Sequence, residues 1–361
     1  MNERKIKKTA IYPYHAAVFA IVRYLETLNP IYQIEKIVTP SIRGNGVDAG
    51  RLFNKTELGI IVTNDIDEAI DTCDCLIIAE GAYADKLRQL IMDKIKSALH
   101  KKKEVICTLK LTKKELESLG AENFCHLPDH PEEVKIPDIS KKLYSPNAPV
   151  IFVGEMTNGL DGFDITLGMT NFFRKEGYRT VTIAERSWSG LLNIKAIPDF
   201  MRHHDIDENS KVYAFNQRIK ELEQKENPSV FIIQLPGALM KFNDKLTAGF
   251  GIIPYLISLA VQAEYMIVST FYDTMNSVFF ETLSERFEHQ IGVGIDALCI
   301  SNTFIDIPDS MEKNIFSYLR IEQKKVNEEV EKLNQTGEIP TYNCCNPEEF
   351  KEMCQQIIAG L

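Results

Sequence analysis

Short, continuous apolar runs alternate with amphipathic segments along most of this chain. Apolar runs of this length between helical segments are typical of a parallel β-sheet that helices cover on both faces. The sequence therefore predicts an α/β fold. In the first third of the chain the predicted strands include residues 8–14, 32–40, 73–81 and 104–110.

The alternation stops between residues 127 and 148, where prolines and charged residues replace it. Such a composition is typical of a linker. A chain of 361 residues is long enough for two domains. We predict two Rossmann-like parallel-sheet domains joined by this linker. Residues 1–126 form the first, and residues 149–361 form a domain like those of phosphate-loop NTPases, with a degenerate loop and C-terminal helices.

The stretch VIFVGEMTNGLDGFDITLGM, Val150–Met169, has the order of strand, glycine loop and helix that a phosphate-binding loop requires. In the motif GxxxxGK[ST], backbone N–H groups surround the phosphates and a lysine contacts them. Gly154 and Gly159 fit the two glycines of this motif. However, Leu160 and Asp161 stand where the lysine and the serine or threonine belong.

A longer loop that pivots at Gly162 does not supply the lysine either, because Phe163 and Asp164 follow it. Both registers place a carboxylate near a phosphate, which is repulsive. In NTPases of this type the third strand also ends in an aspartate before a glycine, and this aspartate helps to hold Mg²⁺. The equivalent run here is VFIIQLPG, with Gln234 in that place. Amide oxygen is a poorer Mg²⁺ ligand than carboxylate, so the two losses together favour a fold without NTPase activity.

Three other interpretations of the loop stay open. It can be a plain strand-to-helix turn, a working site with a lysine supplied by Lys195 or Lys241, or a carboxylate site for a cationic group or a metal. Ligands bind at the carboxyl ends of strands in such sheets. The candidate ligand-binding residues are Gly154, Glu155, Thr157, Asn158, Gly159, Asp161, Gly162, Asp164, Gln234 and Gly237.

A second glycine-rich loop, IRGNGVDAG, follows a predicted strand of the first domain. Its glycine spacing is not GxGxxG, so a dinucleotide site, a flexible binding loop and a plain surface loop stay open. The candidate residues there are Arg43, Gly44, Gly46, Asp48 and Arg51. Farther along the chain, Trp188 lies beyond a strand end, where it either anchors a partner or closes the core.

Eight cysteines are spaced without the paired CxxC pattern of zinc or iron–sulfur sites. We therefore predict no metal site, and we expect most thiols to be buried apolar groups. Cys344 and Cys345 precede a helix predicted to be capped by Asn346, with Pro347 at its first position. An acidified, reactive thiol at this helix N-terminus is the alternative.

The net charge of −10 argues against a nucleic-acid-binding face, which would be basic. No run of about 18 apolar residues is present, so no membrane span is expected. The N-terminal segment lacks the apolar core of a secretory signal. We therefore expect a cytoplasmic protein, and homo-oligomerisation stays open.

Four segments between about residues 9 and 300 are distinctive: AIYPY, the VTP…G…DAG loop, GIIVTNDIDEAIDTCDCLIIAEG and LPGALMKFNDKL…FGIIPYLISLAVQAEY. In these segments the chain resembles a family of clostridial peptide maturation system proteins. Such proteins occur in gene cassettes for ribosomally synthesised, modified peptides, and the resemblance supplies no active-site residues. More distantly, the second domain is similar to loop NTPases of the synthetase type, with the departures at Leu160, Asp161 and Gln234.

The resemblance and the two missing groups together predict a non-catalytic accessory protein of a peptide natural-product pathway. Its partner would be a precursor peptide, a peptide-modifying enzyme, or both. An NTP-dependent ligase or transferase that acts on a peptide or small molecule is the alternative. No cofactor is assigned, and nucleotide binding is not favoured.

Overall fold

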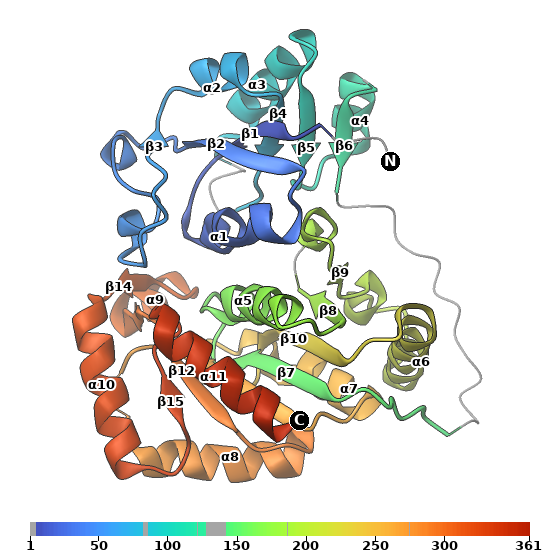
Figure 1. Cartoon of the computed structure of the whole chain (residues 1–361), viewed down its shortest axis with the longest axis vertical. Helices are drawn as coiled ribbons and strands as arrows, with labels where there is room; N and C mark the ends of the chain where they lie inside the picture. The colour runs from blue at the N-terminus through green and yellow to red at the C-terminus, as the bar shows by residue number, and fades with distance from the viewer. Residues whose placement is uncertain (1–4, 82–85, 121, 128–141, 186, 274) are drawn as a thin grey trace. The chain divides into compact units, whose positions relative to one another are not determined.

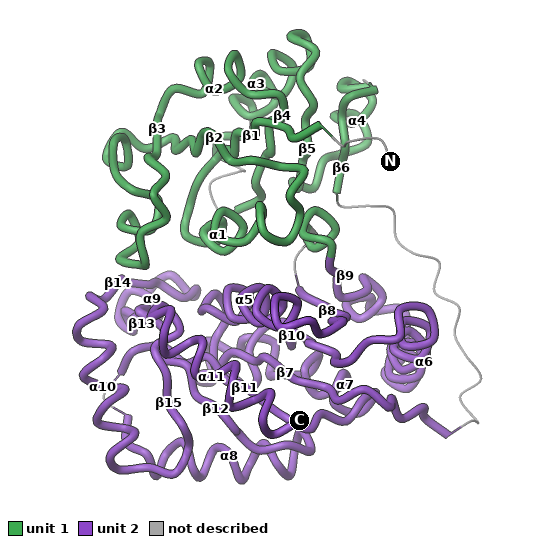
Figure 2. The backbone as a smooth tube through the Cα atoms, viewed as in Figure 1, with its two compact units in different colours: residues 1–130, 187–193 green, residues 131–186, 194–361 purple. Residues whose placement is uncertain are grey.

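The computed structural model describes residues 5–81, 86–120, 122–127, 142–185, 187–273 and 275–361. The chain forms two compact units (Figure 2). Unit 1 combines residues 1–130 with 187–193, and unit 2 combines residues 131–186 with 194–361. The short segment 187–193, predicted as part of the second domain, therefore groups with the first. The predicted linker 127–148 stays a prediction, because most of it lies outside the described residues.

Unit 1 is built on a six-stranded sheet in the order β3-β2-β1-β4-β5-β6, and every pairing is parallel. This is the strand order of Rossmann folds, in which the order of strand addition reverses beside β1 while all strands stay parallel. The strands are β1 (Lys7–Tyr12), β2 (Tyr32–Val38), β3 (Val62–Thr63), β4 (Cys75–Ile78), β5 (Glu104–Cys107) and β6 (Phe124–His126). The helices are α1 (Phe19–Leu28), α2 (Ile66–Thr72), α3 (Arg88–His100) and α4 (Lys113–Leu119). Figure 1 shows α1 on one face of the sheet and α2 and α3 on the other.

Unit 2 is built on a seven-stranded parallel sheet in the order β15-β12-β11-β7-β10-β8-β9. Its first strand, β7, is central and lies between β10 and β11. The strands are β7 (Val150–Glu155), β8 (Thr180–Ala184), β9 (Lys195–Ala196), β10 (Val230–Ala238), β11 (Tyr265–Thr270), β12 (Ala297–Ile300) and β15 (Thr341–Tyr342). A separate antiparallel hairpin joins β13 (Thr303–Ile305) to β14 (Tyr318–Arg320).

Helices cover both faces of this second sheet, as continuous apolar strands require. One face packs against α5 and α11, through side chains such as Met169 and Met353. The other face packs against α6, α7, α8 and α10, through side chains such as Phe215, Ile257 and Phe287. The helices of unit 2 are α5 (Gly162–Lys175), α6 (Glu208–Glu226), α7 (Ile252–Ala260), α8 (Ser277–Ile291), α9 (Ile307–Lys313), α10 (Gln323–Thr336) and α11 (Pro347–Gly360). The predicted fold class, two Rossmann-like α/β domains of which the second is phosphate-loop-like, is confirmed.

Trp188 belongs to the segment that groups with unit 1. It is fully buried in a short 3₁₀ helix, Ser187–Leu192, and its indole N–H donates to Glu80 Oε1 at 2.9 Å. The Asn29 side chain donates to the Leu191 carbonyl at 2.8 Å, and the Asn193 side chain donates to the carbonyl of Leu28. The interpretation of Trp188 as an exposed anchor is therefore wrong, because its side chain is fully buried.

An ion pair joins α3 to α4 in unit 1. The guanidinium of Arg88 donates to both carboxylate oxygens of Glu115, at 2.7 and 2.8 Å. Glu115 also accepts from the backbone N–H of Thr112, with which it forms a capping box at the start of α4. The hydrogen bonds from Arg88 lower the pKa of Glu115 from 4.5 to about 2.

This lowered pKa predicts how the ion pair responds to acid. A carboxyl whose pKa is lower in the folded state stabilises the fold above its unfolded pKa and loses that effect as the pH falls through its folded pKa. We expect Glu115→Gln to lower the free energy of unfolding by about 1 kcal/mol at pH 7. The difference from wild type should shrink as the pH falls from about 4.5 to about 2. Urea unfolding of both proteins across this range measures it, and a difference that stays constant with pH would contradict the assignment.

Of the helices in the described ranges, none is both long and apolar enough to cross a bilayer.

Candidate functional site

The glycine loop connects the central strand β7 to helix α5 at the carboxyl edge of the second sheet (Figure 1). The predicted order of strand, loop and helix is confirmed. Gly159 has a φ of 84°, in the left-handed region that glycine adopts without strain. The loop therefore has the position and the backbone of an anion-binding loop at a helix N-terminus.

The carboxylate of Glu155 occupies the interior of this loop. Glu155 Oε2 accepts from the backbone N–H groups of Gly159 and Leu160, at 3.0 and 3.2 Å, and Oε1 accepts from Gly162 N at 2.8 Å. These amide groups face inward as they would toward a bound phosphate. Glu155 is only 6% exposed. The protein thus places its own anion where a phosphate-binding loop would hold a ligand.

The absence of a side chain at Gly162 makes this contact geometrically feasible. A Cβ atom at Gly162 would lie 2.7 Å from the Glu155 carboxylate, closer than real Cβ contacts allow. Glycine at this position therefore leaves room for the Glu155 carboxylate.

Two more carboxylates lie at the start of α5. Asp161 and Asp164 are each 7% exposed. The backbone N–H of Asp161 contacts Ser269 Oγ, at the end of β11, at 3.4 Å. The N-terminal end of a helix stabilises negative charge, which offsets part of the cost of burying these groups. Together with Glu155 they make the loop negatively charged, which disfavours a phosphate ligand.

The Gln234 side chain accepts a hydrogen bond from a backbone N–H group. β10 pairs with β7, and the regular pairing of the two strands ends at Gln234. The Gln234 side-chain oxygen accepts from Glu185 N at 3.1 Å, and Glu185 Oε2 accepts from Gly237 N at 3.3 Å. These contacts connect the ends of β8 and β10, and the amide oxygen of Gln234 is used in them.

Tyr318, on the β13–β14 hairpin, lies against the glycine loop. Its hydroxyl donates to the Asn158 carbonyl, and its ring is 3.4 Å from the Cβ position of Gly159. Burial, followed by the negative charge of Glu155, raises the pKa of Tyr318 above its ordinary value. Leu160 packs in the same cluster, with Phe271 and Ile305. The hairpin therefore covers the loop, a contact between residues 160 positions apart that no sequence pattern indicates.

The two lysines considered as donors to the loop have other partners. Lys195 Nζ lies 2.9 Å from Glu226, and Lys241 Nζ lies 2.6 Å from Asp244. These contacts give no support to a site completed by a distant lysine.

The second candidate loop, in unit 1, is organised around Asp48. Its carboxylate accepts from the backbone N–H groups of Gly50, Arg51, Leu58 and Gly59. Burial by itself raises the pKa of Asp48, but these donors outweigh it and leave the pKa below its ordinary value. The Asp48 carboxylate therefore holds the backbone of this loop in place through four hydrogen bonds.

The other members of this loop are dispersed. Arg51 pairs with Glu57 on the surface, Arg43 is exposed and Gly44 is buried. Gly46 lines a hollow of about 550 Å³ beside β2 and β3. The structure therefore does not bring the five predicted residues to one point.

The cysteines near the second sheet are buried. Cys344 lies against Cys299, and burial, followed by the neighbouring Cys299 and the charges of Asp161 and Asp164, raises its pKa well above the ordinary value. The interpretation of Cys344 as an acidified thiol is therefore wrong. Asn346 caps α11 as predicted, accepting from Glu348 N at 3.1 Å. Among the described residues no group of three or more His, Cys, Asp or Glu side chains is placed to hold a metal ion.

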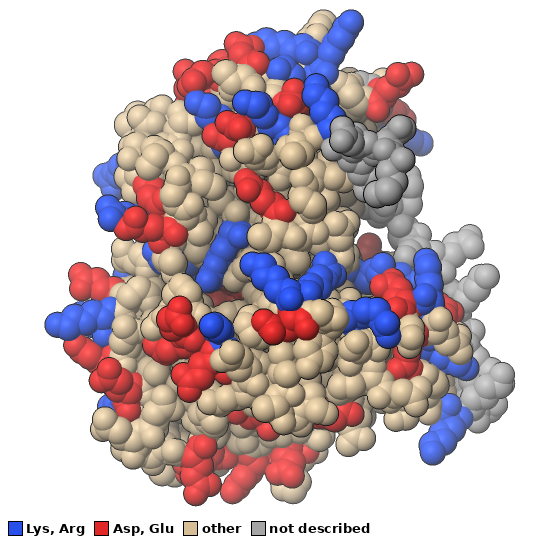
Figure 3. Space-filling view, viewed as in Figure 1, with Lys and Arg blue, Asp and Glu red and all other residues tan. Residues whose placement is uncertain are grey.

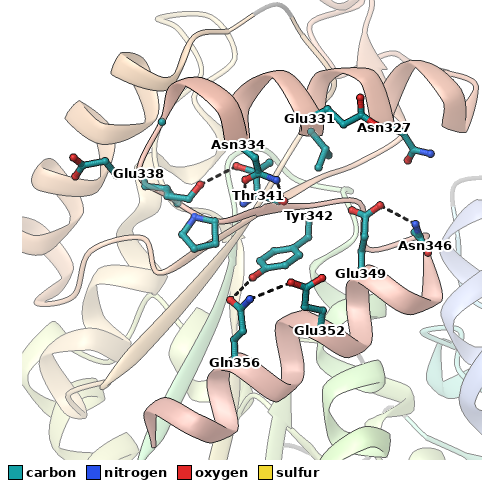
Figure 4. Close-up of a pocket in the computed structure, with 14 residues that line it drawn as sticks. Asn327, Glu331, Asn334, Glu338, Thr341, Tyr342, Asn346, Glu349, Glu352 and Gln356 are labelled. Atoms are coloured by element: carbon teal, nitrogen blue, oxygen red, sulfur yellow. Dashed lines mark hydrogen bonds between the residues drawn. The ribbon is translucent and has the colours of Figure 1, made fainter.

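A pocket of about 620 Å³ lies between α10, β15 and α11 (Figure 4). Glu331, Glu338, Glu349 and Glu352 line it, and within the described part of the chain none of them forms an ion pair. Its surface therefore attracts positive charge and repels phosphate. Sequence reasoning missed this pocket because its sides come from two helices and an edge strand.

The outer edge of β15 faces this pocket. β15 is the last strand of its sheet among the described residues, and within them one side of its backbone has no strand partner. The carboxamide of Asn334 takes that place: it accepts from Thr341 N at 2.9 Å and donates to Thr341 O at 2.8 Å. Glu349 accepts from Asn343 N at 2.7 Å. Side chains thus satisfy an edge that would otherwise be available to another strand.

The chain has structural similarity to proteins of known structure. A solved structure of a DUF1611 family protein from Anabaena variabilis has a TM-score of 0.63 and 10% sequence identity, over 97% of this chain and 99% of its own. At that identity the likeness shows the fold alone. MinD from Aquifex aeolicus has a TM-score of 0.36 and 11% sequence identity, over 59% of this chain and 98% of its own. A TM-score this low does not establish a common fold. No protein-family model and no curated protein sequence matches the chain.

Proposed function

We propose that this chain is a non-catalytic binding protein in the maturation of a ribosomally synthesised peptide. The position of Glu155 is the observation that supports a protein without nucleotide chemistry. Its carboxylate accepts from the three inward-facing amides of the glycine loop. A nucleotide phosphate would have to displace this buried group and then lie beside Asp161 and Asp164.

The pathway rests on the resemblance to clostridial peptide maturation proteins. The partner is a precursor peptide, a peptide-modifying enzyme of the same gene cassette, or both, and the setting is the cytoplasm. In support, unit 2 keeps a complete α/β scaffold, and its glycine loop is filled by protein groups. Such a scaffold can present a binding surface without hydrolysing nucleotide.

The proposal predicts that nucleotides do not bind at the glycine loop. We expect isothermal titration with ATP or GTP, each with Mg²⁺, to give no heat of binding at concentrations up to about 1 mM, which corresponds to less than 4.1 kcal/mol of affinity. Micromolar binding would contradict the proposal and favour an NTP-dependent ligase or transferase.

The peptide partner is tested separately, by capture of the full chain on the immobilised precursor peptide and on the modifying enzyme of its cassette. Binding to either supports the proposal. If the chain binds neither the peptide nor the modifying enzyme, and nucleotide binding is also absent, then the pathway assignment is wrong. The interpretation that Glu155 fills the glycine loop would still hold.

A further inference from the structure

Helix α7 exposes an apolar stripe. Its sequence, IIPYLISLA, contains no charged residue. Ile252, Tyr255 and Leu259 are 53%, 40% and 46% exposed. Their spacing of three and four residues places them on one face of the helix. The opposite face, with Leu256 and Ile257, packs on the sheet.

The stripe continues onto neighbouring segments. α7 and α8 contact each other, and both follow strands of the same parallel sheet, so their first turns lie at the same edge. Val278 and Phe279, in the first turn of α8, are 62% and 42% exposed. Phe250, just before α7, is 55% exposed. We call this set of six residues the α7–α8 surface: Phe250, Ile252, Tyr255, Leu259, Val278 and Phe279.

The backbone before α7 holds Phe250 outward in an unfavourable conformation. Residues 248–251 all have positive φ, including Ala248 at 47° and Phe250 at 57°. Left-handed backbone is disfavoured for residues with a Cβ atom and is an outlier for a bulky one. Gly251 cannot be replaced here, because a Cβ atom would lie 2.1 Å from the Leu239 carbonyl. Backbone strain of this kind concentrates at functional positions.

The size and charge of the surface fit a second copy of the chain. An aromatic side chain buries roughly 150–250 Å² when covered, and an aliphatic one somewhat less. The six residues, three of them aromatic, are 40–62% exposed, so together they leave on the order of 500 Å². A two-fold contact covers that area twice, on the order of 1,000 Å² before its polar rim is added, which is the threshold for a specific interface. The six residues carry no charge, so two chains of net charge −10 can meet there without placing like charges in contact.

We propose that the α7–α8 surface is the interface of a two-fold symmetric homodimer. In such a contact the same patch meets itself. Two copies of α7 then lie antiparallel, with Phe250 and Ile252 of one protomer against Leu259 of its partner. Tyr255, near the middle of the helix, lies close to the symmetry axis and to its own copy.

The test is the oligomeric state of the full chain by sedimentation velocity across a range of concentrations. We expect a dimer for the wild type and a dissociation constant raised roughly 100-fold for Tyr255→Glu, because two like charges meet at the axis. Ile42→Glu is the control, since Ile42 is 82% exposed in unit 1 and lies outside the surface. It should dimerise as the wild type does.

A charge-complementing pair makes the test specific for self-association. Tyr255→Glu mixed with Tyr255→Lys should form a heterodimer, whereas Tyr255→Lys alone should not dimerise. Circular dichroism melts of each variant check that the fold is kept. A wild type that stays monomeric at about 100 μM, or a Tyr255→Glu variant that dimerises like wild type, would overturn the proposal.

Discussion

Replacing Glu155 by alanine is expected to lower the free energy of unfolding of unit 2 by about 3 kcal/mol. The change leaves the amides of Gly159, Leu160 and Gly162 without their acceptor. Each hydrogen bond to a charged group contributes about 1.5–3 kcal/mol, and water entering the opened loop recovers part of the loss. Urea unfolding followed by circular dichroism measures the change.

The same variant should gain an anion site. Once the carboxylate is gone, the loop amides and the N-terminus of α5 are available to inorganic phosphate or sulfate. We expect millimolar phosphate to raise the melting temperature of Glu155→Ala and to leave the wild type unchanged. Asp161 and Asp164 keep this affinity low. Equal effects of phosphate on both proteins would show that Glu155 does not occupy the anion position.

Glu155→Gln is the matched control for this prediction. The glutamine keeps the size of the side chain and one acceptor oxygen, but its amide group places N–H donors opposite one of the loop amides. Its destabilisation should be smaller than that of Glu155→Ala, and phosphate should give it no added stability, because the side chain still fills the loop.

Replacing Trp188 by alanine is expected to lower the free energy of unfolding of unit 1 by about 3–5 kcal/mol, the range for deleting a fully buried tryptophan. Trp188 is 0% exposed, and its N–H donates to Glu80. Hydrogen exchange read out by mass spectrometry locates the effect. Amides of β1 and β4 in unit 1 should lose protection, and those of β7 and β10 in unit 2 should not.

Trp188→Phe separates packing from hydrogen bonding at this site. Phenylalanine restores most of the buried surface but lacks the indole donor, so we expect a loss of about 1–2 kcal/mol. If Trp188→Ala destabilises both units equally, then the segment 187–193 does not belong to unit 1 in solution.

The fold class was predictable because buried parallel strands leave a strong local signal. Runs such as VIFVG and CLIIA are apolar at every position, which occurs when both faces of a strand are covered. The assignment of residues 187–193 was not predictable. The sequence SWSGLLN has no periodicity that shows which sheet it packs on, since that depends on tertiary contacts such as Asn29 with Leu191.

The glycine loop was recognised from its spacing, and the loss of its lysine was visible directly. The role of Glu155 was not, because a carboxylate that turns back into its own loop follows the same pattern as one that faces solvent. Tyr318 and the pocket beside β15 depend on contacts between distant residues, which one sequence does not reveal. Whether the candidate residues bind a ligand stays a prediction.

Unit 1 combines two separate segments of the chain, and this affects the order in which the units can fold during synthesis on the ribosome. The first sheet is complete after β6, but its core lacks Trp188 until residue 193 has emerged. By then β7 has been made, whereas its two sheet neighbours, β10 and β11, have not. At about 5–20 residues per second they follow several seconds later. The nascent chain should therefore finish unit 1 while β7, the central strand of unit 2, still lacks both of its sheet neighbours.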